Sequence, residues 1–129
     1  MITVTAQLKK LRMSPKKVRL VLDVVRGLRV AVAEERLTFM KRGACDPVLK
    51  LLRSAIANAV HNHKARPETL RIAGLRADGG ATQKRWRPRA HGRAFPVRQR
   101  TSQITMVLKG EAEGATAEAK VEAAEPEKK

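Results

Sequence analysis

The residues with the clearest capacity for chemistry lie in one stretch, KRWRPRAHGRAFPVRQR, which runs from Lys84 to Arg100. Arginine dominates it, and arginine presents a planar, permanently charged fork that grips phosphates and stacks on bases. Runs of charge are usually only solvated, but cations this dense repel one another unless a polyanion neutralises them. The stretch therefore predicts a loop that binds nucleic acid. It contains no acid and seven cations: Lys84, Arg85, Arg87, Arg89, Arg93, Arg98 and Arg100.

The other residues of this stretch suit a stiff, sharply turning backbone. Gly92 allows the chain to turn or to approach another backbone closely, and Pro88 and Pro96 reduce the entropy lost on ordering. Trp86 fits two roles, stacking on a base or packing against arginine stems. The whole chain has only two Phe and no Tyr, so a stacking platform for single strands is not expected. The expected partner is a folded RNA, read by its shape and phosphate geometry.

Residues suited to catalysis or metal binding form no constellation elsewhere. The carboxylates are scattered without a paired arrangement, and neither the dinucleotide nor the P-loop fingerprint is present. His61 and His63 are two residues apart, which points them to different faces of a helix, and Cys45 is the only cysteine. We therefore expect no enzymatic activity, no catalytic residue, no metal site and no cofactor. A zinc enzyme built on these three residues is an alternative that a metal analysis would decide.

The charge of the chain is strongly positive and unevenly distributed. Its 129 residues carry a formal net charge of +16. Residues 1–110 hold 25 Lys and Arg against 6 Asp and Glu, or +19, whereas residues 111–129 hold 3 against 6. A body this cationic attracts polyanions, and nucleic acid is the default partner. The segment 110–129, GEAEGATAEAKVEAAEPEKK, is instead an acidic low-complexity tail, predicted to be disordered or only locally helical.

Three features bear on the compartment in which the chain works. No apolar run approaches the ~18 residues of a membrane span, and no basic segment has the apolar face and aromatic anchors of a membrane-surface helix. The beginning, MITVTAQLKK, lacks the order of a secretory signal. A single cysteine excludes an intrachain disulfide. These features indicate a reducing, cytoplasmic location and no membrane partner.

Three helices and three strands are predicted to position the charged stretch. A period of two predicts strands over residues 2–8, 70–78 and 101–109, the last two pairing as an antiparallel hairpin. Apolar residues at helical spacing predict helices over residues 15–26, 30–41 and 47–63. Ser14 and Asp46 are the expected N-caps of the first and third helices, and Pro67 is the expected stop of the third.

Two cations of the first predicted helix also indicate a ligand. Lys16 and Lys17 lie in its first turn, where the helix dipole disfavours positive charge. A bound phosphate there would offset this conflict.

The segment between the last two strands is long enough to project from the body. About 20 residues separate Leu70 from the middle of the loop near Ala90, and they reach ~65 Å at ~3.3 Å per residue. A compact domain of this length has a radius of gyration near ~13 Å. Residues 79–99 lack alternating apolar residues and so have no core of their own. We expect an arm that is disordered in the free protein and ordered by its partner.

Four segments together resemble one protein family. They are SPKKVRLVLDVVRG, SAIANAVHN, KRWRPRAHGRA and RTSQIT, and their order and spacing over residues 5–109 are similar to those of the bacterial large-subunit ribosomal protein L-twenty-two family. The resemblance implies an α+β fold, with three helices packed on a small antiparallel sheet and a long projecting β-hairpin. It implies one RNA-binding domain over residues 1–109, with the hairpin arm at about 70–109 and its tip at about 84–95, followed by the tail at 110–129.

The resemblance also implies a function. The protein would be a structural constituent of the large ribosomal subunit that binds 23S ribosomal RNA, supports assembly and lines the nascent-peptide exit tunnel with its tip, near the macrolide site. Its partners would be this RNA, neighbouring large-subunit proteins and the nascent peptide, with no obligate homo-oligomer. The implied RNA contacts are Lys16, Lys17, Arg19, Lys84, Arg85, Arg87, Arg98 and Arg100. The implied tunnel-facing tip is Arg89, Ala90, His91, Gly92 and Arg93.

Two points stay open at the level of sequence. Trp86 and Phe95 are bulkier than the family pattern leads us to expect near the tip. The charge pattern alone also fits a DNA-architectural protein, a dimer whose paired basic β-arms enter the minor groove. Copurifying nucleic acid separates the two possibilities, because ribosomal RNA supports the first and genomic DNA the second.

Overall fold

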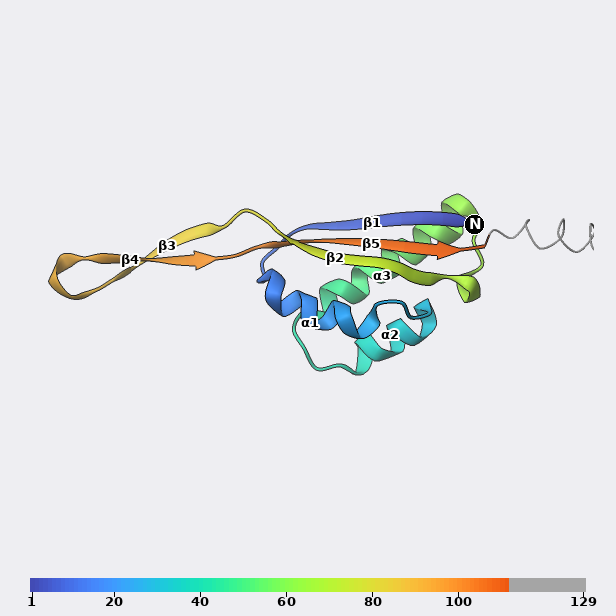
Figure 1. Ribbon diagram of the computed structural model, residues 1–129, viewed down its shortest axis with the longest axis horizontal. Helices are drawn as coiled ribbons and strands as arrows, with labels where there is room; N and C mark the ends of the chain where they lie inside the picture. Colours follow the sequence, from blue (N-terminus) through green and yellow to red (C-terminus); the bar gives the residue numbers. More distant parts are fainter. Residues whose placement is uncertain (112–129) are drawn as a thin grey trace, which may run out of the picture.

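The computed structural model describes residues 1–111, which form a body of three helices and a three-stranded sheet, and an arm of two further strands (Figure 1). The predicted α+β class with three helices on a small antiparallel sheet is confirmed. The predicted tail falls almost wholly outside the described residues. The elements are β1 (Ile2–Leu11), α1 (Pro15–Val25), α2 (Val30–Phe39), α3 (Cys45–His63), η1 (Pro67–Thr69), β2 (Arg71–Gly79), β3 (Gln83–Pro88), η2 (Ala90–Gly92), β4 (Ala94–Gln99) and β5 (Ser102–Gly110).

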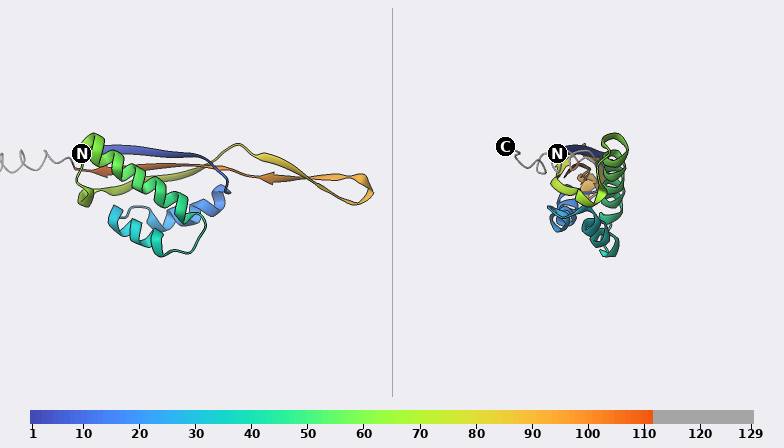
Figure 2. Two further views of the ribbon diagram at one scale, coloured as in Figure 1. Left: turned by 180° about the vertical axis from the view of Figure 1, so that it is seen from behind. Right: turned by 90° about the vertical axis from the view of Figure 1, so that its right-hand side faces the viewer.

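The sheet of the body is antiparallel in the order β1-β5-β2, so the strand that comes last in the sequence lies in the middle. Strand β5 alternates as predicted, with Ile104, Met106 and Leu108 fully buried and Gln103 and Lys109 exposed. This pattern is typical of a sheet that packs on one face only. Figure 2 shows the three helices gathered on one side of the sheet.

Helix α1 supplies much of the core next to the sheet. It begins at Pro15, whose missing N–H costs nothing at the first helical position. Four apolar residues at helical spacing are buried, namely Val18, Val21, Leu22 and Val25. Gly27 then adopts a φ of 77°, a left-handed conformation that favours glycine and ends the helix. None of the three helices described here combines the length and the apolar character that a membrane crossing requires.

Helix α3 begins two residues before its predicted start and ends at His63, as predicted, but neither end has the predicted cause. It starts at Cys45, because the N–H of Cys45 bonds to the carbonyl of Arg42 at 3.0 Å and the preceding residue is already helical. Asp46 therefore lies inside the first turn, and its predicted role as N-cap is wrong. Lys64, with a φ of 49°, closes the other end, so Pro67 is not the stop that was predicted. Ser14 does occupy the N-cap position of α1, but its side chain makes no capping bond.

Strand β5 extends to a residue that the sequence alone places in the tail. Gly110 pairs with Ile2 of β1. A Cβ atom at this position would lie 2.6 Å from the Cδ2 atom and 3.4 Å from the Cα atom of Leu70, so the close approach of the two segments favours glycine here. The ordered sheet thus includes residue 110.

The arm consists of β3 and β4, which pair only with each other and extend away from the body (Figures 1 and 2). Every side chain from Lys84 to Pro96 is exposed. All 23 buried apolar residues of the described chain belong to the body. The arm accordingly has no core. Its side chains form a surface that is open to a partner.

Candidate nucleic-acid interface

Cations occupy both faces of the arm. In an antiparallel pair, directly opposed residues share a face, and successive pairs alternate between faces. Lys84 opposes Arg98 on one face, and the next pair, Arg85 with Val97, lies on the other. Arg87, opposite Phe95, returns to the face of Arg85. This two-sided distribution suits a segment surrounded by a polyanion better than one resting on a flat surface.

The positive charge of the arm is not compensated by any salt bridge within residues 1–111. Lys84 and Arg98 face each other directly, an arrangement that destabilises a two-stranded ribbon in isolation. Asp78, just before the arm, is bound to Arg76 at 3.0 Å. Among residues 1–111, the side chains of the arm cations donate a single hydrogen bond, from Nη1 of Arg85 to the carbonyl of Lys84 at 2.9 Å. The guanidinium forks of the arm therefore keep nearly all their donors for a partner.

The tip is a tight turn that presents two arginines side by side. The backbone N–H of Arg89 donates to the carbonyl of Arg93 at 2.8 Å, and η2 (Ala90–Gly92) forms the turn between them. His91 and Gly92 both adopt positive φ values, 59° and 67°. The predicted need for glycine at position 92 thus has its cause in the turn, since no atom lies within 4 Å of where a Cβ would stand.

The two bulky residues of the arm have different neighbours. The guanidinium carbon of Arg89 lies 5.5 Å from the ring centroid of Phe95, within the range of a cation–π contact. Phe95 therefore supports the tip arginine. Trp86 opposes Pro96 and remains 65% exposed, so most of its ring is open to a partner.

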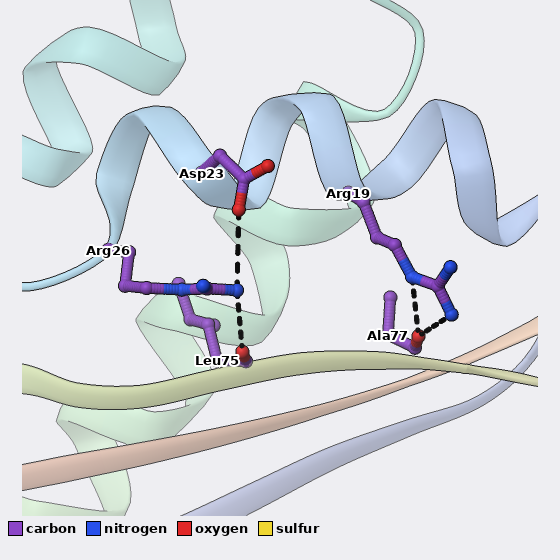
Figure 3. Close-up of polar contacts among 5 residues, drawn as sticks. All are labelled: Arg19, Asp23, Arg26, Leu75 and Ala77. Carbon is purple, nitrogen blue, oxygen red and sulfur yellow. Dashed lines mark hydrogen bonds and ion pairs between the residues drawn. The ribbon is translucent and has the colours of Figure 1, made fainter.

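The predicted contacts of the body fall into two groups. Lys16 and Lys17 are exposed in the first turn of α1, as the sequence indicated. Arg19 instead turns to the sheet, where its Nε and Nη2 donate to the carbonyl of Ala77 at 3.1 and 3.0 Å (Figure 3). The structure thus gives Arg19 a role inside the body, which the sequence did not indicate.

A second arginine, Arg26, makes the same kind of contact about two helical turns further along. Nη2 of Arg26 donates to the carbonyl of Leu75 at 3.2 Å and lies 3.3 Å from Oδ1 of Asp23 (Figure 3). The N–H of Val30 donates to the carbonyl of Leu70, just before β2, and the carbonyl of Leu28 accepts from the N–H of Ile72 in β2. Four backbone groups on this edge, from Leu70 to Ala77, are therefore engaged, which partly shields an edge strand from other chains and attaches the strand that leads into the arm to α1.

Arg100 lies where the arm joins the sheet, together with a cation that sequence reasoning missed. Arg12, just beyond β1, donates from Nη2 to Oε1 of Gln83 at 3.2 Å and so connects the body to the first residue of β3. Only one feature of the sequence could have indicated Arg12. It follows Lys9 and Lys10 in a basic cluster at the end of a predicted strand.

The residues of the alternative zinc site do not come together. Cys45 is buried at the beginning of α3, whereas His61 and His63 are exposed in its last turn. Within residues 1–111, no three potential ligands are close enough to hold a metal ion.

Comparison with known proteins agrees with the shape and charge of the chain. The family model described as "Ribosomal protein L22p/L17e" matches residues 6–109. The chain is 52% identical over 116 residues to "Large ribosomal subunit protein uL22" of Synechococcus sp. (strain JA-2-3B'a(2-13)), covering 88% of this chain and 94% of that protein. It is 43% identical over 106 residues to the uL22 protein of Mycoplasma capricolum, covering 82% and 96%. It is 50% identical over 100 residues to "Large ribosomal subunit protein uL22c" of Spirogyra maxima, covering 78% and 84%.

These relatives carry names of ribosomal proteins, in agreement with the expectation that the chain is not an enzyme. The match includes the body and the whole arm, because residues 6–109 run from β1 to the penultimate residue of β5. The chain therefore belongs to the ribosomal protein L22 family of the large ribosomal subunit.

Proposed function

We propose that this protein is a structural constituent of the large ribosomal subunit, in the cytoplasm, that binds 23S ribosomal RNA and supports subunit assembly. The observation that carries the proposal is the arm, which has cations on both faces and no buried residue between Lys84 and Pro96. Entry into RNA replaces repulsion between these cations with contacts to phosphates and releases counterions. If all seven cations of the stretch met phosphates, the log–log salt slope of binding from the arm would reach about −5.

The body and the arm form one RNA-binding domain over residues 1–109, and the body contributes RNA contacts of its own. Lys16 and Lys17 present their charges at the beginning of α1, where a phosphate would also meet the positive end of the helix dipole. Arg19 holds this helix on β2, the strand that leads into the arm. Contacts made by α1 and by the arm are thereby kept in a fixed relation, and Arg19 serves RNA binding by positioning rather than by contact.

The tip has a second task, forming part of the wall of the nascent-peptide exit tunnel near the macrolide site. Arg89, Ala90, His91, Gly92 and Arg93 are exposed and lie in the turn furthest along the hairpin. The cation–π contact with Phe95 and the backbone bond between residues 89 and 93 hold the two arginines at this turn. The partners that follow are 23S ribosomal RNA, neighbouring large-subunit proteins and the nascent peptide, with no membrane and no obligate homo-oligomer.

Competition for incorporation into the subunit tests the proposal. Equal amounts of tagged variant and untagged wild-type protein are expressed together, and their ratio is measured by mass spectrometry in large subunits from a sucrose gradient. Arg85→Glu with Arg98→Glu reverses charge on both faces of the arm, so we expect a more than tenfold preference for the wild type.

The matched control is Arg89→Glu with Arg93→Glu, which makes the same change in charge at the tip. We expect this variant to be incorporated much more readily, because tunnel-facing side chains touch less RNA. Incorporation of the Arg85 and Arg98 variant in proportion to its supply would contradict the role of the arm as an RNA anchor.

A further inference from the structure

The elbow, where the arm leaves the sheet, contains a hollow that the arm and body build together. It has a volume of about 620 Å³, within the range of about 300–1,000 Å³ typical of small-ligand pockets. Its walls come from the end of β1, the link between β2 and β3, and the beginning of β5. It is lined by Lys10, Arg12, Gly80, Ala81, Gln83, Thr101 and Gln103.

An unusual backbone conformation turns a cation toward this hollow. Lys10 has a φ of 57°, which a side chain other than glycine rarely adopts, and the pairing of β1 with β5 shifts register between Leu8 and Leu11. Such bulges redirect side chains, and strain of this kind concentrates at functional sites. The body has no packing need for it, because Lys10 is exposed and makes no hydrogen bond within the described part of the chain.

The floor of the hollow is held in place by hydrogen bonds between the link that joins β2 to β3 and the link that joins β4 to β5. The N–H of Gly80 donates to the carbonyl of Thr101 at 2.8 Å, and the hydroxyl of Thr101 donates to the carbonyl of Ala81 at 2.5 Å. A Cβ at position 80 would lie 2.6 Å from Oγ1 of Thr101, so any side chain there would have to displace the hydroxyl that bonds to Ala81. The floor is therefore formed before any ligand arrives.

The polar groups of the hollow suit a ligand that carries both a negative charge and groups able to form hydrogen bonds. Arg12 donates to the Oε1 of Gln83, which leaves the amide N–H groups of Gln83 free to donate elsewhere. Two further hollows, of about 550 and 230 Å³, adjoin at Arg12, and no acidic residue lines any of the three. Asp78, opposite Gln103 in register, is engaged by Arg76.

We propose that this elbow pocket receives one unpaired nucleotide of the RNA, with its phosphate on Lys10 and Arg12 and its base edge on the amides of Gln83 and Gln103. The inference rests on the RNA binding proposed above and assigns to it a site outside the arm cations. Because the walls belong to both body and arm, a nucleotide seated there fixes the direction in which the arm leaves the body. RNA docking on the body and insertion of the arm are thereby coupled.

The left-handed conformation of Lys10 provides a clean test. Lys10→Gly removes the cation but keeps a residue that tolerates positive φ, so the fold should be no less stable. Lys64→Gly is the matched control, since Lys64 is also an exposed lysine of positive φ, at 49°. It lies at the opposite end of the sheet, beside Arg66, whose N–H bonds to the carbonyl of Glu111. Both variants lose one charge and one strained side chain.

Affinity for 23S ribosomal RNA is measured by filter binding over a series of salt concentrations, with thermal unfolding of each variant recorded alongside. We expect Lys10→Gly to weaken binding about tenfold and to reduce the salt slope by about 0.7 to 0.9, and Lys64→Gly to leave both nearly unchanged. Equal losses in the two variants, or no loss in Lys10→Gly, would overturn the elbow pocket and leave RNA binding itself intact. Failure of the wild-type protein to bind this RNA would remove the proposed function as well.

The base-edge contact has its own test in the assembled complex. Gln83→Leu together with Gln103→Leu removes both amides and, with them, the acceptor of Arg12, but it removes no cation. We expect one unpaired nucleotide, protected from base-specific chemical modification in the wild-type complex, to become reactive in this variant. An unchanged modification pattern would overturn the assignment of a base to the pocket.

Discussion

The body and the arm of this protein are built on opposite principles. The body places its 23 buried apolar residues between one face of a sheet and three helices. The arm buries no side chain between Lys84 and Pro96, opposes Lys84 to Arg98 and contains no acid. The structure of the body follows from contacts among its own residues, whereas the residues of the arm are suited to contacts with a partner.

This difference predicts that stability and binding respond to different substitutions. Changes in the body should move the free energy of unfolding, with an indirect effect on binding. Changes in the arm should move binding and leave unfolding almost untouched. The following three experiments test this separation, beginning with the largest expected effect on stability.

Truncation of Leu108 should cause the largest loss. Leu108 is fully buried in the central strand β5, between Val4 of β1 and Ile72 of β2. Leu108→Ala should lower the free energy of unfolding by about 3 kcal/mol, from lost burial and the cavity that remains. Urea denaturation followed by far-UV circular dichroism measures it. Val107→Ala, on the open face of the same strand, is the control, and a cost equal to that of Leu108→Ala would show that the helical side is not the core.

Removal of the two arginine contacts to β2 should have an intermediate effect. Arg19→Met with Arg26→Met keeps the apolar stems but deletes the donors to Ala77 and Leu75. Both contacts are only partly buried, so we expect a combined loss of about 1–2 kcal/mol. Arg29→Met serves as the control, since the side chain of Arg29 makes no hydrogen bond within residues 1–111. Urea denaturation followed by circular dichroism measures the loss. An unchanged denaturation midpoint for the double variant would mean that these contacts do not hold α1 on the sheet.

Charge reversal in the arm should have the smallest effect on stability. Arg85→Glu with Arg98→Glu, expected to impair incorporation, should shift the free energy of unfolding by less than about 0.5 kcal/mol, as is usual for exposed positions. Thermal unfolding of the purified variant beside the wild type is sufficient. A loss of stability comparable to that of Leu108→Ala would show that the arm and the body fold as one unit, and the separation between them would not hold.

The sequence alone predicts the elements whose signal repeats along the chain. Val18, Val21, Leu22 and Val25 recur at helical spacing, and residues 104, 106 and 108 alternate, because each element buries one face. The arm is predictable for the opposite reason, since residues 79–99 offer nothing to bury. In each case, the property that determines the structure is local and can be read from neighbouring positions.

Contacts between distant segments are beyond such reasoning. Arg19 looks like Lys16 and Lys17 in the sequence, yet its acceptor lies 58 residues away, at Ala77. Arg12 and Gln83 are separated by 71 residues. The elbow pocket consists of such pairings, which explains why no sequence motif indicated it.

The position of β5 in the sheet has a consequence for the order in which the chain can fold. Strands β1 and β2 do not pair with each other, and each pairs with β5. During synthesis, the first strand, the helices and the whole arm are therefore made before the strand that joins them exists. The pairing of Ile2 with Gly110 spans nearly the entire described chain, and such non-local closure is slow. We expect the sheet to be completed only after β5 has been synthesised, so that the arm is exposed to polyanions while the body still lacks its central strand.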